Sequence, residues 1–155
     1  MADLKQEIVK VLARAKADIQ ARMQAAGVNA TGRTSASLQV RETATGVFLV
    51  GGGENTAPFP TVEIGRPGGK VPKGFYYIIK QWTRDKGLPF ATERKRGTFA
   101  YFLSRRIAAE GTLRHKQPVD IYTSVAEQAA RNLKGTLYAY IQTNINQQVK
   151  DYGRQ

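Results

Sequence analysis

Apolar residues recur every four positions over the last quarter of the chain, and this repeat constrains the fold more than any other feature. They are Ile121, Val125, Ala129, Leu133, Leu137, Ile141, Ile145 and Val149. The repeat predicts one long helix over 118–150, bent near Gly135. Because an α-helix has 3.6 residues per turn, a stripe of period four winds around it, and we expect the stripe to meet more than one neighbour.

Helical spacing of apolar residues predicts three shorter helices. One lies in the N-terminal segment 1–27, and two of medium length span 75–86 and 93–110. Glycines at 27, 87 and 111 follow these segments, as expected at helix C-termini.

Short β-rich runs occupy the region 36–65. The runs near 38–40 and 47–50 flank a glycine-containing turn and predict a hairpin, and Thr61–Gly65 predicts a third strand. The whole chain of 155 residues is therefore expected to form one α+β domain, with a small antiparallel sheet of three or four strands among the helices. The residues predicted to form its core are Leu4, Ile8, Leu12, Ile19, Val40, Phe48, Val50, Ile64, Ile79, Trp82, Phe102, Leu103, Ile107, Val125, Leu133 and Ile141.

Charge is concentrated in the middle third of the chain. The formal charge is +12, and residues 66–116 contribute +10 of it from thirteen basic and three acidic residues. Such segregation indicates an anionic partner: nucleic acid, a membrane surface or an acidic protein surface. The candidate contact residues are Arg66, Lys70, Lys73, Arg84, Lys86, Arg94, Lys95, Arg96, Arg105, Arg106, Arg114 and Lys116.

Few residues are suited to catalysis. The chain has no cysteine and one histidine, His115, which lies among basic residues with no nearby carboxylate to orient it. The acidic residues are scattered, without the spacing of metal ligands. We therefore expect no enzyme, no metal and no cofactor. The N-terminus carries no apolar signal core and no stretch is long enough to span a membrane, so neither export nor membrane association is expected.

Aromatic residues interleave with the basic ones over 75–106, which raises the alternative of a non-enzymatic DNA-binding protein that uses segment 66–116. The aromatic side chains nevertheless fall mostly on the apolar stripes of the two predicted helices, and such residues more often belong to a core than to a base-stacking surface. The glycine- and proline-rich segment 51–73 is interpreted as either a mobile connection or an arm that becomes ordered against a partner.

Several short motifs resemble the tail-completion and head-to-tail joining proteins of long-tailed bacteriophages. They are Thr-Val-Glu-Ile-Gly at 61–65 with its Pro/Gly loop, Ile-Lys-Gln-Trp-Thr-Arg-Asp-Lys-Gly-Leu at 79–88, Thr-Phe-Ala-Tyr-Phe-Leu-Ser-Arg-Arg-Ile at 98–107 with Glu-Gly-Thr at 110–112, and the helix followed by Ala-Thr-Gly-Arg-Thr at 30–34 that leads into Ser37 and Leu38. The resemblance covers most of the chain, although the helix pair at 75–110 and the long C-terminal helix depart from the compact members of that family.

The resemblance implies a virion structural protein, assembled in the host cytoplasm and located in the phage neck. It implies a homo-oligomeric ring of six or twelve copies that joins the portal or its adaptor to the tail tube and lets DNA pass. The implied partners are other copies of the chain, the neighbouring portal, adaptor and tail-tube proteins, and DNA in non-specific contact.

Overall fold

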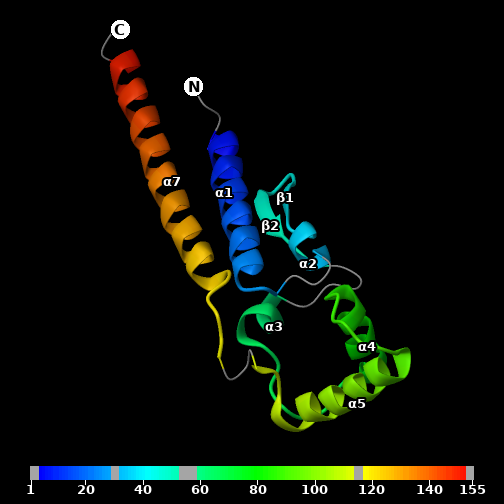
Figure 1. The fold of residues 1–155 in the computed structure, drawn as a ribbon. Coiled ribbons are helices and arrows are strands. Elements are labelled where there is room, and N and C mark those ends of the chain that lie inside the picture. The colour runs from blue at the N-terminus through cyan, green and yellow to red at the C-terminus, as the bar shows by residue number, and fades with distance from the viewer. Residues whose placement is uncertain (1–3, 29–31, 53–58, 114–116, 153–155) are drawn as a thin grey trace.

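A computed structural model describes residues 4–28, 32–52, 59–113 and 117–152. Along the chain the elements are α1 (Leu4–Ala25), α2 (Arg33–Ala36), β1 (Gln39–Glu42), β2 (Val47–Val50), α3 (Phe59–Ile64), α4 (Phe75–Asp85), α5 (Glu93–Glu110) and α7 (Thr123–Tyr152). The fold is mostly helical, with one small antiparallel sheet and a long C-terminal helix (Figure 1). The predicted long helix and both medium helices are therefore confirmed.

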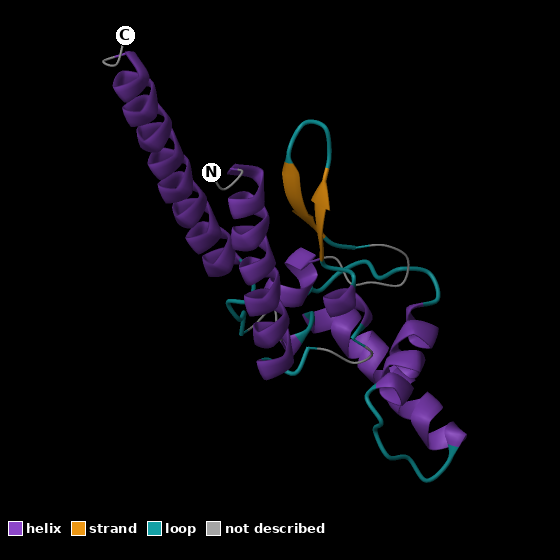
Figure 2. Cartoon of the chain, turned by 90° about the horizontal axis from the view of Figure 1, so that it is seen from above, coloured by secondary structure: helices purple, strands orange, loops and turns teal. Residues whose placement is uncertain are grey.

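The main core lies between α1 and α7, which run antiparallel side by side (Figures 1 and 2). Ile19 and Met23 of α1 meet Ile121 and Val125 at the start of α7, and all four side chains are buried. An ion pair closes the same end, because the Arg22 guanidinium lies 2.9 Å from the Asp120 carboxylate. The predicted core residues Ile19 and Val125 are thus confirmed.

The β-hairpin packs on α1 away from α7 (Figure 1). Its register pairs Val40 with Leu49 and Arg41 with Phe48. Leu49 packs against the core, whereas Phe48 is 47% exposed. The prediction that Phe48 belongs to the core is wrong because successive strand residues point to opposite faces, and only one face of this hairpin meets α1.

The third predicted strand is also wrong: residues 59–64 form the short helix α3, so the described residues hold a sheet of two strands. Pro60 lies in the first turn of α3, where its missing N–H costs no hydrogen bond. Tertiary contacts favour the helix, because the backbone carbonyl of Glu63 accepts from Val119 N–H (3.2 Å) and its carboxylate accepts from Tyr122 N–H (3.2 Å). Glu63 is buried and Ile64 is exposed, which reverses the predicted placement of Ile64 in the core.

Helices α4 and α5 form a helical hairpin that projects away from the α1–α7 pair (Figures 1 and 2). Small side chains dominate its seam, since Thr83, Ala100 and Ser104 are buried there together with Ile79. Ile79 is therefore a confirmed core residue. Trp82 and Phe102 are exposed, the latter by 65%, and their predicted place in the core is wrong because no other helix or strand of the described residues covers the outer faces of this hairpin.

The other predicted core residues divide into two groups. Ile141 on α7 is exposed, so its assignment to the core is wrong. The remainder are half-buried around the edges of the two packed units: Leu4, Ile8, Leu12, Val40, Val50, Leu103, Ile107 and Leu133.

The loop after α3 is fixed against the end of α5. Arg66 exchanges hydrogen bonds with Thr112, and Gly69 N–H donates to the Ala108 carbonyl. A Cβ at Gly68 would lie 2.5 Å from the Ala109 carbonyl oxygen, so only glycine permits this approach. Residues 65–69 of the segment 51–73 are held against α5 of the same chain, so this part is neither a mobile connection nor an arm that waits for a partner. Residues 53–58 of the same segment lie outside the described residues.

Candidate nucleic-acid or protein interface

The basic residues predicted to form a contact surface lie on the α4–α5 hairpin and on the loop 66–73 that precedes it. Arg114 and Lys116 lie outside the described residues, as does His115. The structure brings most of the other ten onto one projecting part of the molecule, but it gives them different roles.

One group of cations gathers around the Glu93 carboxylate, at the N-terminus of α5. Arg84 lies 2.8 Å, Arg96 3.0 Å and Lys80 3.5 Å from its carboxylate oxygens. The hydrogen bond from Arg84 and the charges of Arg84, Arg96 and Lys80 hold the pKa of Glu93 below its usual value of 4.5. Lys80 and Arg84 therefore link α4 to α5, whereas the Arg96–Glu93 pair lies within the first turn of α5.

Other cations hold the hairpin in place. The Lys86 ammonium donates to the Gly27 carbonyl (2.6 Å), which fixes the end of α4 to the end of α1. Arg66 donates to the Lys70 carbonyl and lies over the Phe75 ring at 5.4 Å. Arg106 lies 3.5 Å from Glu110, one turn further along α5. Outside the predicted set, Arg33 lies 3.4 Å from Asp85 and makes a second link between the hairpin and the rest of the chain.

Five predicted cations have no carboxylate partner among the described residues. They are Lys70, Lys73, Arg94, Lys95 and Arg105, and all five are exposed. Arg105 lies 5.7 Å from the centre of the Tyr101 ring and donates to its hydroxyl. Among the described residues of the basic segment, these five side chains remain available to an anionic ligand.

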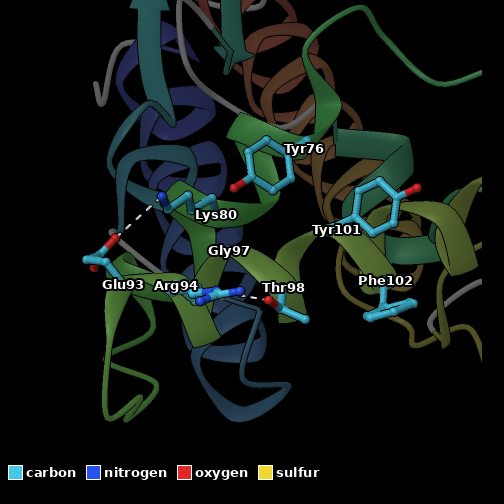
Figure 3. Close-up of a pocket in the computed structure, with 8 residues that line it drawn as sticks. All are labelled: Tyr76, Lys80, Glu93, Arg94, Gly97, Thr98, Tyr101 and Phe102. Carbon is cyan, nitrogen blue, oxygen red and sulfur yellow. Dashed lines mark hydrogen bonds and ion pairs between the residues drawn. The ribbon is translucent and has the colours of Figure 1, made fainter.

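An open groove of about 710 Å³ runs between α4 and α5 (Figure 3). Its lining residues are Tyr76, Lys80, Glu93, Arg94, Gly97, Thr98, Tyr101 and Phe102. Gly97 forms the floor, because a Cβ there would lie 2.9 Å from the Tyr76 hydroxyl. Arg94 and Tyr101 come from α5 and Tyr76 from α4, so both helices must pack correctly to form the groove.

Exposed aromatic side chains line the groove and lie beside it. Tyr101 and Phe102 form part of its lining, and Tyr77, which is 72% exposed, lies against Tyr76 with their ring centres 5.0 Å apart. The sequence interpretation placed these aromatic residues mainly in a core and therefore missed this surface. A sequence signal was present on α5, because Ala100 and Ser104 are four positions apart and so lie on one face of the helix. Small residues on that face allow the two helices to pack closely while the aromatic residues of α5 stay on other faces.

Aromatic rings beside unpaired cations can stack on nucleobases while the cations contact phosphates, and they can also form the centre of a protein interface. The described residues contain no cluster of three or more His, Cys, Asp or Glu side chains suited to a metal ion. Within that same part of the chain, no helix has both the length and the apolar character needed to cross a membrane. Comparisons with known protein families, with curated proteins and with solved structures give no match for this chain.

Proposed function

We propose that this protein is a structural subunit of the neck of a long-tailed bacteriophage, where several copies form a ring that joins the portal side to the tail and through which DNA passes. The sequence motifs at 61–65, 79–88 and 98–107 support this proposal through their resemblance to tail-completion and joining proteins.

One observation of the structure carries most weight. Unpaired cations gather on a helical hairpin that projects from the core, beside exposed aromatic residues. A ring subunit needs a rigid body and a separate surface that contacts its neighbours or passing DNA. In this chain the α1–α7 pair can serve as the body and the α4–α5 hairpin as the surface. Contacts with DNA in a channel involve phosphates and therefore need no sequence preference.

Electron cryomicroscopy of phage particles that contain this protein tests the proposal directly. The expected map shows several copies in a closed ring between the portal and the tail. A map with one copy per particle, or with the protein elsewhere in the virion, would contradict it.

The alternative is a DNA-binding protein that acts on its own, and the groove with Tyr76, Tyr101 and Arg94 favours it. The two functions differ in how binding depends on sequence and salt. For the neck subunit we expect weak binding to duplex DNA without sequence preference, and the binding should fall steeply as salt increases. A preferred sequence at physiological salt would favour the alternative.

A matched pair of triple variants locates the DNA contact. Arg94→Ala, Lys95→Ala and Arg105→Ala together remove three unpaired cations and should lower the slope of log K against log salt by roughly 2–3. Lys10→Ala, Arg14→Ala and Arg131→Ala remove the same charge from α1 and α7 and should change the slope much less. Equal effects of the two triple variants would show that net charge alone drives binding.

A further inference from the structure

The distal half of α7, residues 137–152, carries an apolar face that is turned away from α1. Each step of four residues turns the stripe by about 40° around the helix, so Val149 lies about 200° from Ala129, which is buried against α1. Tyr138, Ile141 and Ile145 fall on the same outer side as Val149. In both views the last turns of α7 extend away from α1 (Figures 1 and 2).

These outward side chains are exposed although they are large and apolar. Val149 is 65% and Tyr152 is 79% exposed, and Ile145 is exposed by more than half. A contiguous apolar surface of this kind on a folded chain marks an interaction site.

The segment 135–149 contains no charged residue, within a chain whose net charge is +12. Depletion of charge is typical of the buried centre of protein interfaces. Two copies of such a basic chain repel each other, and this segment is where they can meet with the least electrostatic cost.

The spacing of the apolar residues is symmetric about Ile145. Tyr138, Ile141, Ile145, Val149 and Tyr152 are separated by three, four, four and three positions. If two such helices lie antiparallel about a two-fold axis at Ile145, Tyr138 of one copy faces Tyr152 of the other, Ile141 faces Val149, and Ile145 faces itself. A two-fold contact requires a surface that is complementary to itself, and this pattern provides it.

We propose that a second copy of the chain docks on this face, with the distal halves of the two α7 helices antiparallel and centred on Ile145. Complete burial of the exposed parts of the five outward side chains would remove on the order of 600 Å² per copy, at the lower end of the range for specific interfaces. The contact is isologous and therefore differs from the head-to-tail contact of a ring, so it does not depend on the proposed function.

Light scattering of the full chain after size exclusion tests the dimer. The wild-type protein should be dimeric at micromolar concentration, and Ile145→Asp, which places two carboxylates face to face, should weaken the dimer by roughly tenfold or more. Asn146→Asp adds the same charge at the neighbouring position, outside the apolar face, and should remain dimeric. Circular dichroism checks that both variants keep their helices. A monomeric wild-type protein, or a dimer that survives Ile145→Asp, would overturn the proposal.

The lack of cysteine allows the register to be tested by oxidative cross-linking. Ile145→Cys should form a disulfide-linked dimer with itself, whereas Tyr138→Cys should cross-link only with Tyr152→Cys when the two variants are mixed. Cross-linking of Tyr138→Cys with itself would indicate parallel helices and overturn the antiparallel arrangement. If the wild-type protein is a monomer but the Ile145→Asp variant fails to assemble into particles, the apolar face binds another protein instead of a second copy. The dimer proposal would then fail, while the proposed ring in the phage neck would not be affected.

Discussion

The α1–α7 pair with its β-hairpin and the α4–α5 hairpin are both stabilised by helix packing, yet they bury different kinds of residue. The first unit encloses Ile19, Met23, Ile121 and Val125. The second closes over Thr83, Ala100 and Ser104 and leaves most of its large apolar residues on the surface. Large buried side chains contribute about 1.5–3 kcal/mol each, so most of the stability resides in the first unit.

This difference indicates that the α1–α7 pair provides most of the stability, whereas the α4–α5 hairpin provides the surface for binding. A helical hairpin with a thin seam of small residues can display aromatic rings and cations because it does not need them for its own packing. It remains fixed because the Lys86–Gly27 hydrogen bond, the Arg33–Asp85 ion pair and the hydrogen-bonded loop at Arg66 tie its ends to the rest of the chain. The following predictions test this division, beginning with the largest expected effect.

Ile121→Ala should destabilise the protein most. Ile121 is fully buried between α1 and the start of α7, and its truncation leaves a cavity that costs about 2–5 kcal/mol. Guanidinium unfolding followed by circular dichroism measures the loss. Ile64→Ala removes the same atoms from an exposed position and should change the free energy of unfolding by less than about 0.5 kcal/mol. Similar losses in both variants would contradict the assignment of the core to the α1–α7 pair.

Gly68→Ala should loosen the α4–α5 hairpin from its loop. The added Cβ would meet the backbone at Ala109, which cannot move as a flexible side chain would, and the expected cost is about 1–3 kcal/mol. Trp82 is the only tryptophan and lies on α4, so its fluorescence reports on the hairpin while circular dichroism reports on all helices. In the variant we expect the fluorescence transition to come first.

Gly135→Ala provides the matched control for this substitution. It lies inside α7, and a Cβ added there would point into open space, so alanine should stabilise the protein by roughly 0.5–1 kcal/mol through helix propensity. A loss of stability at Gly135, or none at Gly68, would show that these close contacts do not govern the fold.

The sequence predicted helices more accurately than the core. Periodicity placed α5 at its observed bounds and α4 within one residue, because each has a continuous stripe that ends at a glycine or a loop. It misplaced Trp82 and Phe102, since periodicity shows which residues share a face but not whether another element covers that face. It misassigned 61–64 as a strand, because the contacts of Glu63 with Val119 and Tyr122 come from residues far away in the chain.

The sequence predicted only part of the candidate site, again because contacts between residues far apart in the chain cannot be read from the sequence. Charge segregation identified the region, but it could not separate Arg84 and Arg96, which are paired with Glu93, from Arg94 and Lys95, which are not. Adjacent residues on a helix point in different directions, and the partner of each depends on how α4 lies against α5.

The smallest expected effect concerns acid stability of the first unit, through Asp120 at the start of α7. The hydroxyl of Ser124 and then its backbone N–H donate to the Asp120 carboxylate, and with Arg22 they hold its pKa below the ordinary value of 3.8. A lowered pKa in the folded state means that this contribution to stability is complete above 3.8 and is lost as the pH falls through the folded value. Unfolding of Asp120→Asn should therefore depend less on pH than unfolding of the wild type between about pH 5 and pH 3. If the Asp120→Asn variant follows the wild-type curve, the contacts at Asp120 do not stabilise the junction of α1 and α7, and the burial of Ile121 and Met23 holds that end together.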